Sequence, residues 1–197
     1  ITNDAGQIVG LTGLGQTLFG SPLKWVVMLA PLGLVFFLSA RLHKMSFGTA
    51  QTTFWIYAGL MGISMATIFM TFTGASVARV FFITAGTFAG MSLWAYTTKK
   101  DLSGWGSFLF MGLIGIIIAM VVNIFLESSA LQFAISVIGV LVFIGLTAYD
   151  TQAIKNEYAD HFDEETQGKL AISGALRLYL DFINLFIMLL HLFGNRE

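Results

Sequence analysis

Residues 105–126 read WGSFLFMGLIGIIIAMVVNIFL, and none of these side chains is ionisable. A helix needs about 20 apolar residues to cross the roughly 30 Å hydrocarbon core of a bilayer. The stretch is continuously apolar and does not alternate with polar residues, so a helix is favoured over a strand of a membrane barrel. This part of the chain therefore predicts a membrane-spanning helix.

Five further apolar stretches of similar length flank this one. We place the six predicted spans at residues 23–40, 50–72, 77–97, 105–126, 130–150 and 172–193. Of the 197 residues, 56% are hydrophobic and 11% are charged, about half the charged share of an average soluble domain. The predicted fold class is an all-α polytopic membrane protein. Residues 1–22 are expected to form an extracytoplasmic segment, and residues 23–197 a single transmembrane bundle with a hydrophilic cytoplasmic loop at 151–171.

The basic residues predict the orientation of the chain. Placing successive loops on alternate sides puts six of them on one side, namely Arg41, Lys44, Lys99, Lys100, Lys155 and Lys169. The other side receives Lys24, Arg79 and Arg196. The side with six is cytoplasmic by the positive-inside rule, which leaves Ile1 outside. We therefore expect one further helix before this chain, seven in all, in a multi-pass protein of the bacterial inner membrane.

The composition also excludes several classes of function. Ten Lys and Arg against 11 Asp and Glu leave a net charge of -1, which gives no basic surface for a nucleic-acid partner. The absence of Cys excludes disulfides, thiol catalysis and Cys-based metal sites. No Ser-His-Asp arrangement, phosphate loop or intramembrane protease motif is visible. We expect neither an enzyme nor a tightly bound cofactor.

Two acidic residues stand out because they lie in or beside predicted spans. Asp181 lies roughly 13 Å below the start of the last span, near the middle of the bilayer. A charged side chain at that depth is costly unless it is paired, protonated or hydrated, so it predicts a functional site. Asp150 ends the preceding span, and both acids approach from the same side. If they meet, they should share one proton, which makes a pH-sensitive gate plausible.

Plainer interpretations stay open for these residues and their surroundings. Asp181 could pair with Arg177 one turn away, and Asp150 could be exposed to water at a helix end. The acidic segment 160–165 resembles a cation site in composition, but it lacks the spacing of an EF-hand, so a solvated loop is favoured. Asn123 and Asn184 are candidates for hydrogen bonds between helices.

Four segments carry a resemblance to a known family. They are residues 98–103 (TKKDLS), 136–139 (SVIG), 149–155 (YDTQAIK) and 178–186 (LYLDFINLF). With them the chain resembles the Bax inhibitor-one family, also called the transmembrane Bax-inhibitor-motif (TMBIM) proteins. The resemblance implies a seven-helix bundle with a central last helix, acting as a pH-sensitive calcium leak channel.

The resemblance also assigns roles to particular residues. Asp150 and Asp181 match a proton-sharing pair that gates the pore and holds the permeant calcium ion weakly. Arg41 is the best match to a basic latch residue, and Arg177 and Asn184 are candidate supports. A second hypothesis stays open, because some bacterial relatives resemble modulators of the FtsH membrane protease and eukaryotic relatives are linked to suppression of cell death. Such an interaction protein would use the N-terminal segment and the 151–171 loop.

Overall fold

The protein is described by a computed structural model, which covers residues 10, 12–158 and 162–195. Within these residues every regular element is a helix. Their bounds are α1 Gly13–Phe19, α2 Leu23–Arg41, η1 Leu42–Lys44, α3 Phe47–Met65, η2 Ala66–Met70, α4 Gly74–Thr97, η3 Ser103–Trp105, α5 Gly106–Leu126, α6 Ser129–Glu157 and α7 Glu164–Phe193. The described residues hold six helices long and apolar enough to span a membrane. The predicted all-α polytopic fold is confirmed.

The predicted hydrophilic loop at 151–171 is wrong in extent. Helix α6 continues to Glu157, and helix α7 already begins at Glu164. The prediction ended each span where polar residues lower the hydropathy. Backbone hydrogen bonds continue past that point, so a helix can extend beyond the apolar layer. Of the predicted acidic segment, residues 160 and 161 lie outside the described residues. The cytoplasmic placement of this connection stays a prediction.

Asp163 sets the start of α7. Its carboxylate accepts hydrogen bonds from the Thr166 hydroxyl at 2.6 Å and from the Thr166 backbone N–H at 3.2 Å. These two bonds hold the pKa of Asp163 below its usual value. The helix start is therefore supported while Asp163 is ionised, and this support is lost as the pH falls. The acidic segment thus contains a helix cap.

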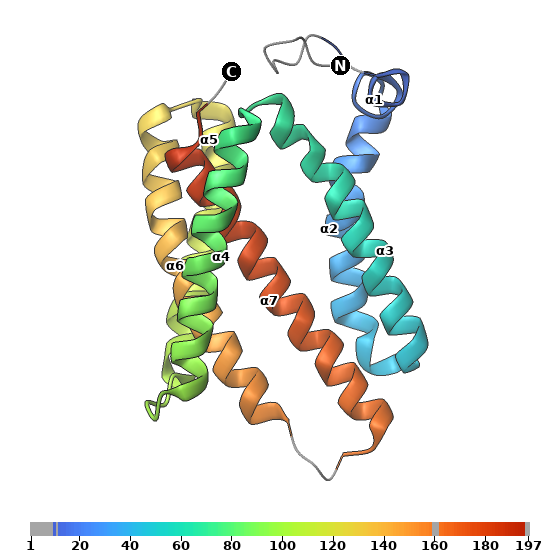
Figure 1. Ribbon diagram of the computed structural model, residues 1–197, viewed down its shortest axis with the longest axis vertical. Coiled ribbons are helices and arrows are strands. Elements are labelled where there is room, and N and C mark those ends of the chain that lie inside the picture. The colour runs from blue at the N-terminus through green and yellow to red at the C-terminus, as the bar shows by residue number, and fades with distance from the viewer. Residues whose placement is uncertain (1–9, 11, 159–161, 196–197) are drawn as a thin grey trace. The chain divides into compact units, whose positions relative to one another are not determined.

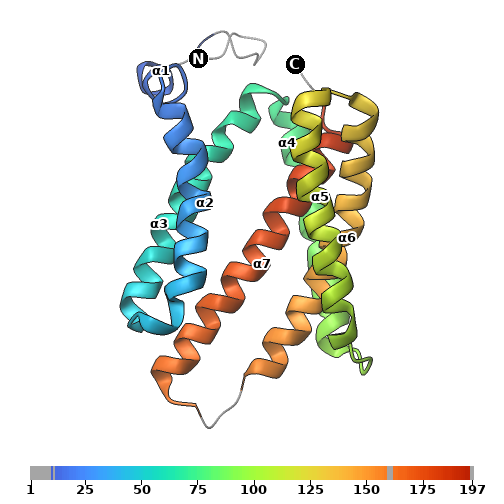
Figure 2. The ribbon, with the colours of Figure 1, turned by 180° about the vertical axis from the view of Figure 1, so that it is seen from behind.

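The N-terminal part of the chain contains more structure than the sequence predicted. Thr12 caps the short helix α1, because its hydroxyl accepts a hydrogen bond from the Gly15 N–H at 3.2 Å. The compact unit that contains α1 comprises Ile1–Gly74, Asp163–Ser173 and Asn195–Glu197. In it α2 and α3 run side by side (Figures 1 and 2). Phe47 of α3 lies against Gly168, where an added Cβ would come within 2.5 Å of its ring.

The second compact unit contains Ala75–Phe162 and Gly174–Gly194, and it carries the candidate site. Its helices α5 and α6 form an antiparallel pair that lies side by side in both ribbon views (Figures 1 and 2). The turn between them is held by Asn123, whose side chain accepts from the Ser128 N–H at 3.0 Å and donates to Gln132 of α6 at 3.3 Å. The predicted role of Asn123 in bonding between helices is confirmed.

Glu127 ends α5 in the left-handed conformation, with φ 47° and ψ 31°. A side chain with a Cβ is strained there, whereas glycine is not. Replacing Glu127 with Gly should therefore raise the free energy of unfolding by about 1 kcal/mol, measured by thermal unfolding in detergent micelles. Glu127→Ala keeps the Cβ and serves as the control. Equal stabilisation by both variants would show that the carboxylate, and not the backbone, is responsible.

The glycines of the second unit differ in how closely they pack against neighbouring helices. Gly86 and Gly90 fit the small-residue pattern of helix association, yet a Cβ added to either meets no described atom of its own unit within 4 Å. A Cβ on Gly145 would instead lie 2.6 Å from Leu109 of α5. Spacing identifies small residues, but their packing depends on which face of the helix meets a neighbour.

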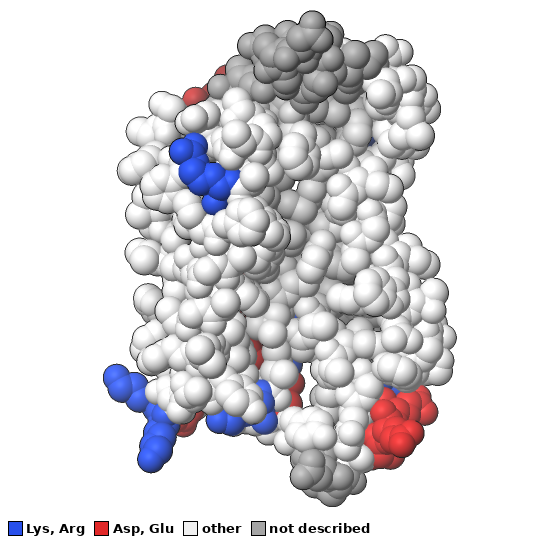
Figure 3. All heavy atoms as spheres, in the orientation of Figure 1, with Lys and Arg blue, Asp and Glu red and all other residues white. Residues whose placement is uncertain are grey.

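Within the second unit, α7 packs against α4 through aromatic rings. Phe182 meets Phe81 and Phe88 edge to face, with ring centroids 5.7 and 5.5 Å apart. Leu185 and Leu190 of α7 are fully buried. Figure 3 shows a mostly uncharged molecular surface on the face in view, as expected for helices in lipid. The contacts fix which side of α7 faces its neighbours, and this determines where its acid points.

Candidate functional site: a buried acid pair

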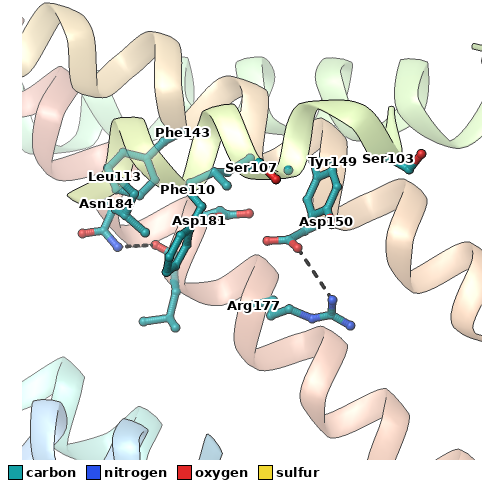
Figure 4. A pocket seen from close by; sticks show the side chains of 13 residues that line it. Ser103, Ser107, Phe110, Leu113, Phe143, Tyr149, Asp150, Arg177, Asp181 and Asn184 are labelled. Carbon is teal, nitrogen blue, oxygen red and sulfur yellow. Dashed lines mark hydrogen bonds and ion pairs between the residues drawn. The ribbon is translucent and has the colours of Figure 1, made fainter. Parts of the chain in front are cut away.

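A pocket of about 570 Å³ opens between α5, α6 and α7 in the second unit. Its apolar lining comprises Phe110, Leu113, Phe143, Leu146 and Leu180. Its polar lining comprises Ser103, Ser107, Tyr149, Asp150, Arg177, Asp181 and Asn184, together with Gly106. Figure 4 shows the side chains of both aspartates directed toward this space. The pocket thus joins an apolar wall to a cluster of charged groups.

The structure brings Asp150 of α6 and Asp181 of α7 together, an arrangement that the sequence alone left open. The two carboxyl groups are near enough to interact by charge. Asp150 is 9% exposed and Asp181 is 5% exposed. One oxygen of Asp181, Oδ2, is buried without a hydrogen-bond partner among the residues that the structure describes. Such an oxygen is a ready acceptor for a proton or a cation.

Asp181 lies well inside its helix. Helix α7 starts at Glu164 and ends at Phe193, so at 1.5 Å per residue Asp181 is roughly 26 Å from one end and 18 Å from the other. The sequence-based distance of roughly 13 Å assumed that this helix starts at residue 172, whereas α7 starts at Glu164. The corrected position still places the acid within the apolar part of the helix.

Arg177 pairs with the acids of α6. Its Nη1 lies 3.7 Å from Oδ1 of Asp150 (dashed line in Figure 4), and its Nη2 donates to the Glu157 carboxylate. The ion pair with Asp181 on its own helix, which spacing along the chain allowed, is not the one observed. The water-exposed interpretation of Asp150 is also wrong, since this residue is buried and lies seven residues before the end of α6.

The other predicted support residues have separate positions. Asn184 lines the pocket, but its side chain donates to the Leu180 carbonyl of its own helix at 2.8 Å. Arg41 is exposed at the end of α2, in the first unit. Its role as a latch therefore stays a prediction.

Sequence reasoning missed a second set of contacts on α6, because these residues fell inside the predicted loop. The Oε1 of Gln152 accepts from the Leu102 N–H at 2.7 Å, and its Nε2 donates to the Lys100 carbonyl at 2.8 Å. Lys155 donates to the Tyr96 carbonyl at 2.7 Å. Gln152 and Lys155 are three residues apart and so share one face of the helix. That helical spacing of polar residues was the available signal.

The electrostatics of the pocket favour a cation. Among the described residues that line it, two acids face a single base, Arg177, which also binds Glu157. Hydroxyl oxygens of Ser103, Ser107 and Tyr149 add neutral oxygen atoms to the lining. No group of three His, Cys, Asp or Glu side chains in the described residues is arranged to hold a metal ion. The site thus offers a calcium ion fewer charged ligands than a tight site would use.

Comparison with known proteins identifies the chain's relatives. The family described as "Inhibitor of apoptosis-promoting Bax1" matches residues 5–197. The inner membrane protein YbhL of Escherichia coli strain K12 is 53% identical over 173 residues, which are 87% of this chain and 74% of that protein. RP147 of Rickettsia prowazekii is 49% identical over 182 residues, 92% of this chain and 75% of that protein.

A protein of Caulobacter vibrioides is 46% identical over 194 residues, 98% of this chain and 74% of that protein. These matches agree with the six membrane-spanning helices. The chain therefore belongs to the Bax inhibitor-1 family and is a multi-pass inner membrane protein.

Proposed function

We propose that the protein is a cation leak channel with calcium as the permeant ion, controlled by the protonation of Asp150 and Asp181. The observation that carries the proposal is the neighbouring pair of buried acids on a pocket, of which only Asp150 lies within ion-pair distance of Arg177 among the described residues. The carboxylate of Asp181, which has no ion pair among the described residues, would attract a cation from the pocket when it is ionised. A tightly bound ion would block conduction, so a weak site is what a conduction path needs.

The same acids supply the proposed sensitivity to pH. Calcium prefers six to eight oxygen ligands, and ionised carboxylates are the strongest of those present in the pocket. Each proton that binds to Asp150 or Asp181 removes a negative charge and occupies an oxygen that a cation would use. The flux of cations is therefore expected to fall as the pH is lowered.

The test is a measurement of calcium entry into proteoliposomes that contain the purified chain and a trapped calcium indicator. We expect entry to exceed that of protein-free liposomes and to decline over the range in which the acid pair becomes protonated. A membrane potential set with potassium and valinomycin keeps the electrical driving force equal at every pH. Entry no faster than in protein-free liposomes at any pH would contradict the proposal.

A further inference from the structure

The guanidinium of Arg177 interacts with two acids of α6. One terminal nitrogen faces Asp150 at 3.7 Å, and the other donates to the Glu157 carboxylate. Asp150 and Glu157 are seven residues apart and so lie on one face of the helix, two turns from each other. The guanidinium of α7 thus bridges two positions along α6.

Neither acid holds the guanidinium with the two parallel hydrogen bonds that make an arginine–carboxylate pair strong. The Nε of Arg177 is buried without a hydrogen-bond partner among the described residues. The two acids also differ in their access to water, since the side chain of Glu157 is 42% exposed and that of Asp150 is 13% exposed. Arg177 therefore has an inner position on the pocket and an outer position near water.

We infer that Arg177 is a tethered cation that competes with the transported cation for Asp150, and that Glu157 is the second position that draws it away. The inference rests on the proposed function, because it names what controls the affinity of the same acid pair. When the guanidinium lies on Asp150, an entering cation finds only Asp181 uncompensated. When it moves to Glu157, both carboxylates face the pocket, and the attraction for a divalent ion rises.

The test uses terbium, a luminescent substitute for calcium, excited through Tyr149 in the pocket lining. Arg177→Gln removes the tethered cation and should tighten terbium binding to the purified protein by about tenfold. Glu157→Gln weakens the outer position, keeps the guanidinium on Asp150, and should weaken binding several-fold. These opposite signs distinguish competition from a structural role, because loss of packing would weaken binding in both variants.

Two further variants complete the design. Arg177→Lys retains the positive charge, so its affinity for terbium should stay near that of the wild type. Glu165→Gln makes the same chemical change as Glu157→Gln in another ion pair, the one that Glu165 forms with Lys169 at 2.8 Å on α7. Its affinity should not change. A size-exclusion profile equal to that of the wild type verifies that each variant is folded.

The outcomes separate this inference from the proposed function. Terbium affinities that move in the same direction in Arg177→Gln and Glu157→Gln, or that stay unchanged in both, would overturn the inference whether or not the protein conducts. Opposite shifts in affinity support the inference. If they occur in a protein that carries no calcium across liposomes, the conduction proposal fails, while the competition between Arg177 and the bound ion stands.

Discussion

Replacing Asp181 with Asn should reduce calcium entry into proteoliposomes at least tenfold at alkaline pH, where the acid pair is ionised, and remove most of the dependence of calcium entry on pH. The variant keeps the size of the side chain but removes the carboxylate that forms no ion pair among the described residues. Two unit charges 4 Å apart interact by about 4 kcal/mol at the dielectric typical of partly hydrated sites. This free energy exceeds the roughly 1.4 kcal/mol that corresponds to a tenfold change in an equilibrium constant.

Asp150→Asn should have a smaller effect on calcium entry, because Asp150 already has Arg177 as a counter-ion. Glu164→Gln is the matched control, since it makes the same change of carboxylate to amide at an exposed position of α7, the helix that carries Asp181. Calcium entry that is unchanged at every pH in both aspartate variants would rule out the acid pair as the gate. Each variant is compared with the wild type at equal protein content per liposome.

The second large effect is expected on stability. Gln152→Ala removes both hydrogen bonds that join α6 to the connection between α4 and α5. It leaves the N–H of Leu102, a residue that is 1% exposed, without its acceptor. We expect the free energy of unfolding to fall by about 2–4 kcal/mol, measured by denaturant unfolding in detergent micelles.

Hydrogen exchange gives a local test of the same prediction, because the amide of Leu102 should lose its protection in Gln152→Ala. Gln51→Ala provides the matched control, since Gln51 is exposed on a helix of the first unit. A stability loss as large in the control as in Gln152→Ala would mean that the two hydrogen bonds contribute little. Gln152→Glu retains an acceptor for Leu102 and should be less destabilised.

The sequence predicted the parts of the fold that depend on hydropathy. Residues 105–126 and five similar stretches were sufficient for the all-α membrane fold, because a span of apolar residues has few other solutions in a bilayer. Connectivity left open that Asp150 and Asp181 could meet, since the two spans that carry them are successive and joined by one connection.

The partners of Arg177 could not be predicted from the sequence pattern. Spacing along a helix suggested Asp181 four residues away, whereas the guanidinium turns to Asp150 and Glu157 on the neighbouring helix. Its direction depends on how α6 and α7 are rotated against each other. Glu157 and Gln152 were missed because hydropathy ended the span early, although the helical hydrogen bonds continue.

The polar end of α6 makes contacts on two opposite faces. Asp150 and Glu157 face Arg177, while on nearly the opposite side Gln152 bonds to the connection between α4 and α5 and Lys155 bonds to Tyr96 at the end of α4. A rotation of α6 about its own axis would disturb both sets of contacts at once. An antibody fragment bound to the connection between α4 and α5 would therefore act on the orientation of the buried acids through α6, from outside the pocket.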